Sequence, residues 1–598
     1  MASQNELVGD IDRYRSIMEG RQRINTPKTI KGFQKATSFK ELDADLVVVE
    51  DSLGFTQELP DGTRQSYMEK QAQERAKGVS EAAAYGHGKI GNRRFVEVAF
   101  NFSYMGGSGG VVVGEKIRRA ADLAIKENLP MVILYSSGGQ RQQEGVSALR
   151  EMLKVTDAIN QFKQKTNQPV VSVLVGNVWG GVSASSVPMG EPVIGIAGTN
   201  FGFAGSSASG QKSLEGALTV ENSSLTNREV QVIANDLVEL VAYLGKYLSF
   251  FGKENLSKRW WKHESTGVDF SKKGFVTPFR TPVTLRNRSR ADMPVPFKLK
   301  SSEDIYEQYR VLCLDARRPD TLYLLEHAFD GFIPLFTGRV TERNTSKGVE
   351  QYLQYPGIVA ALAYIDDPRL QQRLVRMVIG NQPSYLRQPN GLIVREHAQP
   401  TAWDFRHELK MFKFAERMGL QITSFGDTFG AKADLGNDLD AQFAAISDCL
   451  QAQLNYPLFT SGYNIHIGGS GGWMGTVCTA DYVAAFAGAQ EYIAAPTSAA
   501  GIIYKNPDAP KELVKATAEA MRPDAGFLYQ HRFLDQVIQG PKDGVQNDPL
   551  ASAFFIREDI IRCELKFGRL TTEQVLARRE ERMRAQRAIT IGSLYGLK

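Results

Sequence analysis

Two stretches of this 598-residue chain repeat the same order of strand, glycine turn and helix at a fixed offset. Gly430 follows Gly139 by 430 − 139 = 291 residues, and Gly472 follows Gly181 by 472 − 181 = 291 residues. Self-similarity of this kind decides an architecture before any single motif does. We expect the offset to run without a gap, so that the chain consists of two structurally equivalent halves.

Each stretch reads as a strand, a glycine turn, a helix and a second strand that ends at a Gly-Gly pair. In the first half the segments are 131–135, 146–155 and 170–175, and in the second they are 420–425, 439–450 and 456–467. Alternating strands and helices predict layered α/β domains, whose ligands bind at the carboxyl ends of the strands. The glycine turns should therefore line the active site.

The length of the chain exceeds what one hydrophobic core supports, about 250–300 residues. The predicted organisation is an N-terminal helical or irregular extension (1–85), a first domain (86–265), a proline-containing linker (266–310) and a second domain with C-terminal helices (311–598). Within the extension, one helix is expected near 66–84.

Charge and apolar patterning exclude several classes of function. The 71 basic and 66 acidic residues leave a net charge of +5, which is too small for a nucleic-acid partner to be expected. The chain starts with polar residues, and no apolar run reaches the ~18 residues of a membrane span. We interpret it as a soluble cytoplasmic protein without a membrane partner.

The Gly-Gly pairs are the strongest candidates for chemistry. A helix start presents free N–H groups and the positive end of the helix dipole, and glycine lets a ligand oxygen come close. A lone pair is more often a tight turn, but duplication at matched positions favours two oxyanion holes. Two such holes suit carboxyl transfer from N-carboxybiotin to the α-carbon of a thioester, where Gly180-Gly181 would hold the enolate and Gly471-Gly472 the ureido oxygen.

No side-chain nucleophile is evident beside these turns. The chain contains no G-x-S-x-G, H-E-x-x-H or G-x-x-x-x-G-K-[ST] motif. Among the seven histidines, His466 is the one nearest a glycine turn. The glycine-rich run at 106–110 could cradle part of a CoA substrate or could simply be a packed loop.

Several motifs resemble the carboxyltransferase of bacterial acetyl-CoA carboxylase. The first half is similar to its β subunit at 102–108, 113–116, 137–145, 180–185 and 202–205. The second half is similar to its α subunit at 379–382, 415–417, 427–431 and 468–472. We therefore expect the chain to be the carboxyltransferase component of a biotin-dependent acyl-CoA carboxylase. Its substrate would be acetyl-CoA, which gives malonyl-CoA, or a related acyl-CoA.

The resemblance implies a crotonase-type (ClpP/crotonase superfamily) spiral ββα domain in each half, in tandem, with active sites shared between chains of a homodimer or larger homo-oligomer. It assigns the following groups of residues. The catalytic set is Gly180, Gly181, Gly471 and Gly472; the acyl-CoA set is Gly106, Gly107, Lys116, Gly138, Gly139, Arg141, Ala204 and Gly205; the biotin set is Gly430, Gly468, Gly469 and Trp473.

Three features depart from that family. Its β subunits usually carry an N-terminal zinc ribbon, whereas no cysteine precedes Cys313, so no metal is predicted. His466-Ile467 and Trp473-Met474 replace small or acidic residues around the second glycine turn, and 496–500 replaces a Pro-Glu-Gly pattern. We expect the Trp473 ring to reshape or block the second pocket.

The chain lacks an ATP-grasp pattern and a biotin-attachment Met-Lys-Met. A biotin carboxylase and a biotin carboxyl carrier protein on other chains are therefore the implied partners, with biotin as the carried cofactor. Two alternatives stay open: a biotin-independent or carrier-protein-dependent malonyl-thioester decarboxylase or acyl transferase, and a non-catalytic assembly subunit.

Overall fold

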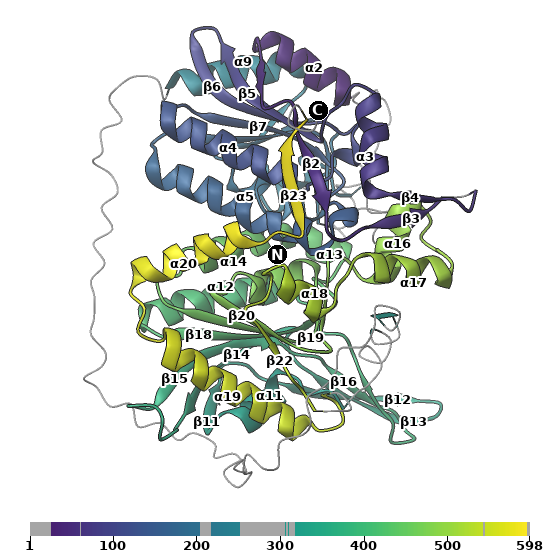
Figure 1. The fold of residues 1–598 in the computed structure, drawn as a ribbon, viewed down its shortest axis with the longest axis vertical. Coiled ribbons are helices and arrows are strands. Elements are labelled where there is room, and N and C mark those ends of the chain that lie inside the picture. The colour runs from purple at the N-terminus through teal and green to yellow at the C-terminus, as the bar shows by residue number, and fades with distance from the viewer. Residues whose placement is uncertain are drawn as a thin grey trace.

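A computed structural model describes residues 26–59, 61–203, 217–250, 305, 306, 309, 317–541 and 545–594. The first and second halves lie one above the other, each built on its own sheet (Figure 1). Most of the predicted linker and the residues Ala204 and Gly205 fall outside the described residues.

The first half is built on a seven-stranded sheet of order β1-β5-β6-β7-β8-β9-β10. Its strands are β1 (Lys40–Leu42), β5 (Ala83–Ile90), β6 (Arg93–Phe100), β7 (Met131–Ser137), β8 (Val170–Val178), β9 (Val193–Ile196) and β10 (Val232–Ala234). One face packs on α4 (Val111–Glu127) and α5 (Gly145–Lys165), and the other on α2 (Thr26–Ala36) and α9 (Leu237–Phe250).

The second sheet repeats this topology, in the order β11-β14-β15-β18-β19-β20-β22, with β21 (Gln490–Tyr492) beside β19. Its strands are β11 (Gly331–Pro334), β14 (Ile358–Ile365), β15 (Leu374–Asn381), β18 (Gln421–Thr428), β19 (Thr460–Gly469), β20 (Tyr482–Phe486) and β22 (Gln536–Ile538). In both sheets the second strand of the order pairs antiparallel with both of its neighbours. From the third strand onward, each strand pairs in parallel with the next one in the order. The prediction of two tandem α/β domains is confirmed.

The strand register corrects the expectation of a gap-free offset. Met131 pairs with Val170, whereas Ile422, 291 residues after Met131, pairs with Thr460, which is only 460 − 170 = 290 residues after Val170. The second half is therefore one residue shorter before β19. From there on the structural equivalents are 290 apart, so Gly181 matches Gly471 and Gly180 matches Ser470.

The two halves meet through helices. α14 (Gln442–Leu454) of the second half packs on α5, and the equivalent side chains Gln164 and Asn455 hydrogen-bond each other at 3.0 Å across the contact. α12 (Ala402–Arg417) lies behind α14, as α4 lies beside α5. None of the helices in the described part of the chain is both long and apolar enough to cross a membrane.

The C-terminal segment clasps both halves. α19 (Pro549–Phe567) packs on α11 (Thr321–Ala328), and α20 (Thr572–Ala585) follows it. After α20, β23 (Ile589–Ser593) pairs antiparallel with β2 (Leu46–Asp51), so this last strand lies against the first half (Figure 1). Arg579 of α20 is buried and donates to the Asp481 carboxylate at 2.8 and 3.0 Å.

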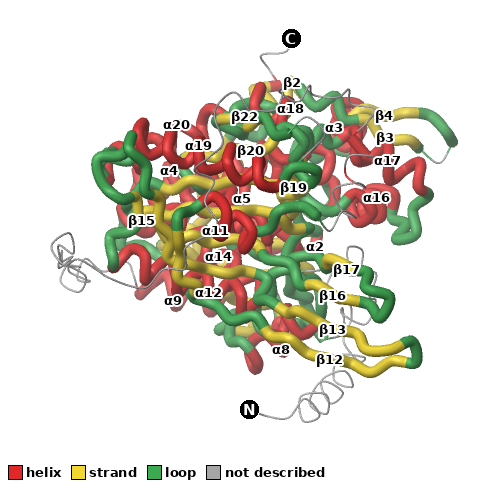
Figure 2. Tube along the Cα trace, turned by 90° about the horizontal axis from the view of Figure 1, so that it is seen from below, coloured by secondary structure: helices red, strands yellow, loops and turns green. Residues whose placement is uncertain are grey.

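A four-stranded antiparallel sheet projects from the second half (Figure 2). It consists of β12 (Arg339–Thr345), β13 (Gly348–Gln354), β16 (Tyr385–Arg387) and β17 (Ile393–Arg395). In the N-terminal part, the expected helix near 66–84 is α3 (Tyr67–Ala76), and a small hairpin, β3 (Thr56–Glu58) with β4 (Arg64–Ser66), precedes it. The first sheet thus begins within the predicted extension, at β1.

We predict that Arg579→Ala destabilises the packing of α20 on the second half, because it leaves the buried Asp481 carboxylate without its cation. Breaking a buried pair in this way costs ~3–5 kcal/mol, which thermal unfolding would show as a fall of several degrees in apparent Tm. Arg584→Ala is the matched control on the same helix, since the Arg584 side chain is 76% exposed and its ion pair among the described residues is with Glu580. An equal effect of the two substitutions would contradict the assignment.

Candidate active site

The first Gly-Gly pair begins a short helix directly after β8. Gly180 and Gly181 are the first two residues of α6 (Gly180–Ser183), and Gly180 has a φ of +62°, which glycine adopts without strain. The Gly180 N–H donates to the Phe203 carbonyl at 2.9 Å. Among the described residues the Gly181 N–H meets no acceptor, so it is a free backbone donor of this turn.

Two further glycine turns adjoin the first one. The Gly138 N–H donates to the Gly106 carbonyl at 2.9 Å, and a Cβ on Gly107 would lie 2.2 Å from the Ser136 carbonyl oxygen. A Cβ on Gly139 would lie 3.4 Å from the Gly180 Cα. The structure thus brings Gly106, Gly107, Gly138, Gly139, Gly180 and Gly181 together.

A second free donor belongs to Gln140, which the sequence reasoning did not single out. Its backbone N–H has no acceptor within the described ranges, and its nitrogen is 4.0 Å from where a Gly180 Cβ would be. The Gln140 side chain covers Gly181, since a Cβ there would lie 2.5 Å from the Gln140 Cγ. The signal was present, because Gln140 follows directly on the predicted Gly138-Gly139 turn.

The second turn repeats this construction at the end of β19. α15 (Ser470–Trp473) starts with Ser470 at a φ of +48°, where the first half has Gly180, and Gly471 and Gly472 follow. The Gly430 N–H donates to the Thr428 Oγ1 at 3.0 Å, as Gly139 donates to the Ser137 Oγ at 3.1 Å. A serine held in the left-handed region is uncommon and marks strain of the kind that clusters at functional sites.

The donors of the second turn are also backbone groups. The N–H groups of Gly471 and Gly472 have no acceptor in the part of the chain that the structure describes. A Cβ on Gly472 would lie 3.0 Å from the Ala431 nitrogen, so the turn after β18 closes on this helix start. Gly469 is equally confined, because its Cβ would lie 2.5 Å from the Phe429 carbonyl.

Two of the predicted acyl-CoA contacts, Arg141 and Lys116, are buried. The Arg141 guanidinium is ion-paired with Glu81 at 2.5 Å and with Glu144 at 3.2 Å. Lys116 is fully buried on α4, with its Nζ 3.5 Å from the Glu41 carboxylate. Both side chains are thus paired within the first half, and their contact with acyl-CoA stays a prediction.

Trp473, which we expected to reshape or block the second pocket, lies beneath the second turn. Its side chain is fully buried and packs beneath the strands, where a Cβ on Gly426 or Gly468 would lie 2.9 or 2.8 Å from the ring. The Arg150 guanidinium lies over the ring, 4.9 Å from its centre. Gly468 is therefore glycine because it makes room for Trp473.

A buried charge cluster lies under the second turn. Arg318 and Arg395 approach the Asp427 carboxylate, and His466 Nε2 lies 3.2 Å from the Pro319 carbonyl oxygen. Burial acts to raise the pKa of Asp427, but the two arginines outweigh it and hold this pKa below its usual range. Burial lowers the pKa of His466 to about 3, so its imidazole is neutral at physiological pH.

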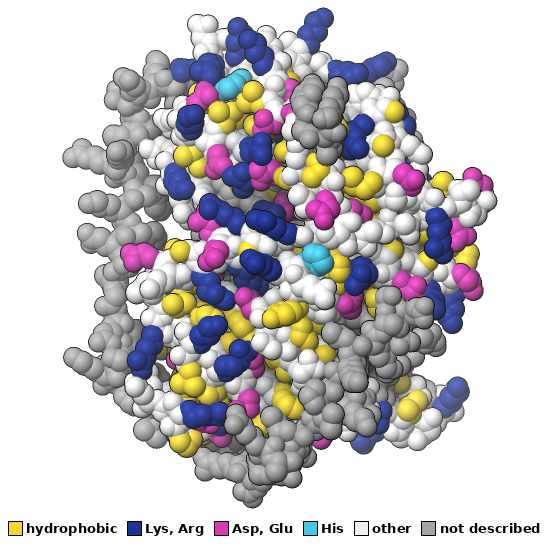
Figure 3. Space-filling view, in the orientation of Figure 1, with side chains coloured by type: hydrophobic (Ala, Val, Ile, Leu, Met, Phe, Trp, Pro, Cys, Tyr) yellow, Lys and Arg dark blue, Asp and Glu magenta, His cyan; other side chains and the backbone are white. Residues whose placement is uncertain are grey.

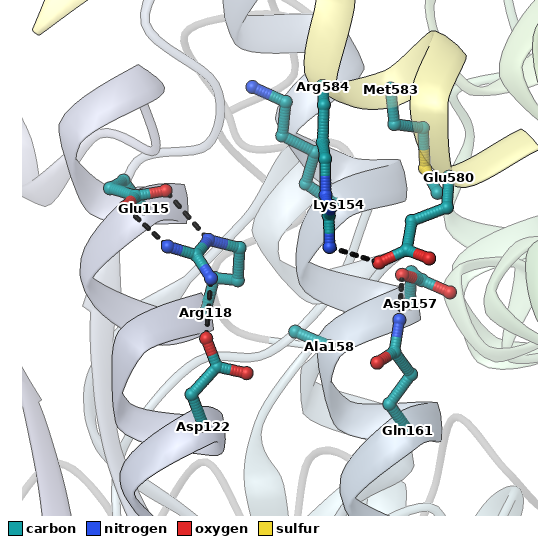
Figure 4. A pocket seen from close by; sticks show the side chains of 10 residues that line it. All are labelled: Glu115, Arg118, Asp122, Lys154, Asp157, Ala158, Gln161, Glu580, Met583 and Arg584. Carbon is teal, nitrogen blue, oxygen red and sulfur yellow. Dashed lines mark hydrogen bonds and ion pairs between the residues drawn. The ribbon is translucent and has the colours of Figure 1, made fainter. Parts of the chain in front are cut away.

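A separate pocket of about 410 Å³ lies between α4, α5 and α20 (Figure 4). Its basic side chains are paired with acidic neighbours: Arg118 with Glu115 and Asp122, and Lys154 with Glu151. Basic and acidic side chains are also mixed over the surrounding face (Figure 3). None of its lining residues belongs to the glycine turns, so we do not place the active site there.

Two family models match successive parts of the chain. Residues 52–242 match the family described as "Carboxyl transferase domain", and residues 305–587 match "Acetyl co-enzyme A carboxylase carboxyltransferase-like". The division between the two matches falls between the two sheets, as the predicted β-like and α-like halves require.

Curated relatives carry the same pairing of halves. The acetyl-coenzyme A carboxylase carboxyl transferase subunits beta/alpha of Salinispora tropica are 27% identical over 581 residues, covering 96% of this chain and 93% of the relative. The beta subunit of Chloroflexus aurantiacus is 38% identical over 175 residues, covering 29% of this chain and 55% of the relative. A transcarboxylase 12S structure aligns over 94% of this chain and 96% of its own, at 15% identity and a TM-score of 0.32, which is too low to argue from.

We predict that Gly181→Val lowers turnover by ~100–1,000-fold, the usual cost of losing one oxyanion donor. Its Cβ would lie 2.5 Å from the Gln140 Cγ and 2.8 Å from the Met152 Sδ, so the turn must shift. Gly488→Ala is the control, because nothing lies within 4 Å of a Cβ there. Steady-state rates near those of the parent protein would refute the assignment of this turn.

The buried His466 should make stability depend on pH. Its pKa is about 3 in the folded protein and near 6.5 when unfolded. Between pH 3 and 6.5 the imidazole is protonated in the unfolded chain but not in the folded one. The contribution of His466 to the free energy of unfolding is therefore present above pH 6.5 and falls with the pH, by up to ~1.4 kcal/mol per pH unit. His466→Gln should lack this component, and the stability gap between parent and variant should shrink from pH 7 to 4 in thermal unfolding; a constant gap would contradict it.

Proposed function

Because the chain belongs to the carboxyltransferase family of acetyl-CoA carboxylase, with its β-like and α-like halves fused, we propose that it transfers a carboxyl group from carboxybiotin to the α-carbon of an acyl-CoA. The observation that carries this proposal is the pair of matched helix starts. Each presents backbone N–H groups without an acceptor among the described residues, at Gly181 and at Gly471-Gly472.

On the acyl-CoA side, we assign the thioester oxygen to the N–H groups of Gly181 and Gln140. Negative charge develops on that oxygen when the α-carbon loses its proton, and donors fixed in advance stabilise it without reorganising. The glycine turns at Gly106-Gly107 and Gly138-Gly139 hold these donors in place and keep side chains away from them. The buried Arg141 network ties the Gln140 turn to Tyr67 and Glu81.

On the biotin side, we assign the ureido oxygen, which gains negative charge as CO2 leaves, to the second helix start. When carboxybiotin is bound, cleavage of its N–carboxyl bond would release CO2 and leave a ureido anion. Its nitrogen would take the α-proton and the resulting enolate would attack the CO2, so the protein would need no side-chain base of its own. The N–H groups of Gly471 and Gly472, which have no acceptor among the described residues, would hold the ureido oxygen. Both glycines are buried in this chain, so biotin would reach them only if the Phe203 ring beside Gly471 gave way.

The reaction requires groups that other chains carry. We propose that a biotin carboxyl carrier protein presents the biotin and that a biotin carboxylase on another chain loads it, with the present chain assembled as a homo-oligomer in the cytoplasm. The names of the relatives in Salinispora tropica and Natranaerobius thermophilus support acetyl-CoA or a close relative as the acyl substrate.

We predict that the purified protein decarboxylates malonyl-CoA slowly when free biotin is added, in the reverse direction of the proposed reaction. Both helix starts act through backbone groups, so the carrier protein is not needed to assemble them. The measurement is release of CO2 with and without biotin. Consumption of malonyl-CoA that is independent of biotin would favour a biotin-independent decarboxylase, and no consumption of any malonyl-type thioester would exclude the carboxylase proposal.

A further inference from the structure

A short helix of the second half is docked on the first helix start. α13 (Leu435–Leu439) follows the Gly430 turn, and its Leu435 and Leu439 pack against Trp179 and Leu218 of the first half. Trp179 is the residue that directly precedes Gly180. The loop after β18 therefore reaches across to the candidate hole of the other half.

Asp438 of α13 binds the backbone of the first half. Its carboxylate is buried, with 2% of the residue exposed, and accepts the Phe203 N–H at 2.5 Å. A hydrogen bond to a carboxylate is roughly twice as strong as one between neutral groups. A Cβ on the neighbouring Gly202 would lie 3.3 Å from the same carboxylate oxygen, which fixes the path of the chain at this point.

Phe203 in turn contacts both helix starts. Its carbonyl accepts the Gly180 N–H at 2.9 Å, and its ring lies against Gly471, where a Cβ would be 3.0 Å from the ring Cζ. One residue therefore separates the two candidate oxyanion sites of a single chain. The Phe203 backbone is hydrogen-bonded to the first helix start, and the Phe203 ring packs against the second.

The bond between Gly180 and Phe203 determines which donor is free. It ties the Gly180 N–H back into the protein and leaves the Gly181 N–H unpaired. If the Phe203 peptide rotated, its carbonyl would no longer accept the Gly180 N–H. Without that hydrogen bond, the backbone of the turn could change its conformation, and the orientation of the Gly181 N–H would no longer be fixed. Holding Phe203 from both of its backbone groups prevents this.

We propose that Asp438 of the α-like half is a positioning residue for the thioester oxyanion site of the β-like half, acting through Phe203. The proposal rests on the function proposed above. Asp438 is not needed merely to join the halves, because the Phe201 and Phe443 rings pack with centroids 4.4 Å apart and planes tilted by 52°, and Asn227 Nδ2 donates to the Leu439 carbonyl at 3.3 Å. Its distinctive contact is with the backbone that holds the turn.

The test compares substitutions at Asp438 in the full chain, with malonyl-CoA decarboxylation in free biotin as the activity. Asp438→Ala removes the acceptor and should lower kcat by ~10–100-fold with the KM for biotin unchanged. Asp438→Asn keeps an oxygen acceptor and should restore kcat to within about threefold. Asp440→Ala is the matched control, because Asp440 lies at the end of the same helix and its carboxylate contacts Trp403, not the first half.

A second variant separates positioning from folding. Phe203→Leu keeps both backbone bonds but withdraws the ring from Gly471, so the KM for biotin should rise severalfold while kcat changes little. Thermal unfolding is measured for every variant, and Asp438→Leu replaces the alanine variant if the latter does not fold.

The outcomes distinguish the two proposals. An inactive parent protein overturns the proposed function itself. An active parent protein with unchanged kcat in both the alanine and the leucine variant at Asp438 overturns the positioning role alone. The positioning role is equally overturned if Asp440→Ala loses as much activity as Asp438→Ala, or if Asp438→Asn does not restore kcat.

Discussion

The hydrogen bond from the Gly180 N–H to the Phe203 carbonyl determines how the first helix start can be used. A helix start offers several N–H groups that lack an intrahelical partner. Here the first of them is tied back to Phe203, whereas the Gly181 N–H has no acceptor among the described residues. That geometry requires a φ of +62° at Gly180 and the close approach of Gly139, so both positions need glycine.

The sequence predicted the duplicated architecture well because the repeat combines hydrophobic strands with glycine turns, and both signals depend on local residue types. The single-residue gap before β19 was not predicted, since the loop that loses it carries no residue identity between the halves. The gap matters, because it makes Ser470 rather than Gly471 the equivalent of Gly180. The projecting sheet of β12, β13, β16 and β17 was also missed, as its strands are polar on much of their surface and lack a clear buried face.

The direction of individual side chains was the least predictable property of the site. Trp473 and Lys116 were assigned to ligands from their place in the sequence, yet both are fully buried. In a four-residue helix such as α15, the fourth residue can point into the site or beneath the sheet, and only the space made by Gly426 and Gly468 decides between them. Asp438 had no sequence signal at all, because its partner Phe203 lies 235 residues earlier in the chain.

The structure also explains why the two halves would act as a unit. The second half holds the first helix start through Asp438, and the first half supports the second one through Arg150 of α5. The Arg150 guanidinium lies over the Trp473 ring and donates to the Cys478 carbonyl at 3.0 Å, at the end of the π-helical turn η9 (Met474–Cys478) that follows α15. It also lies 3.7 Å from the buried Glu491 carboxylate.

This support is reciprocal, and it follows from the duplication itself. When two copies of one fold pack through equivalent helices, each copy presents the loops near its own glycine turns to the other. A buried charge on either side of the contact can then fix the partner's backbone, and a buried charge is retained only where it finds such a partner. Asp438 reaches from the second half into the first, and Arg150 reaches from the first half into the second. Neither candidate oxyanion site therefore has its full support within one half of the chain.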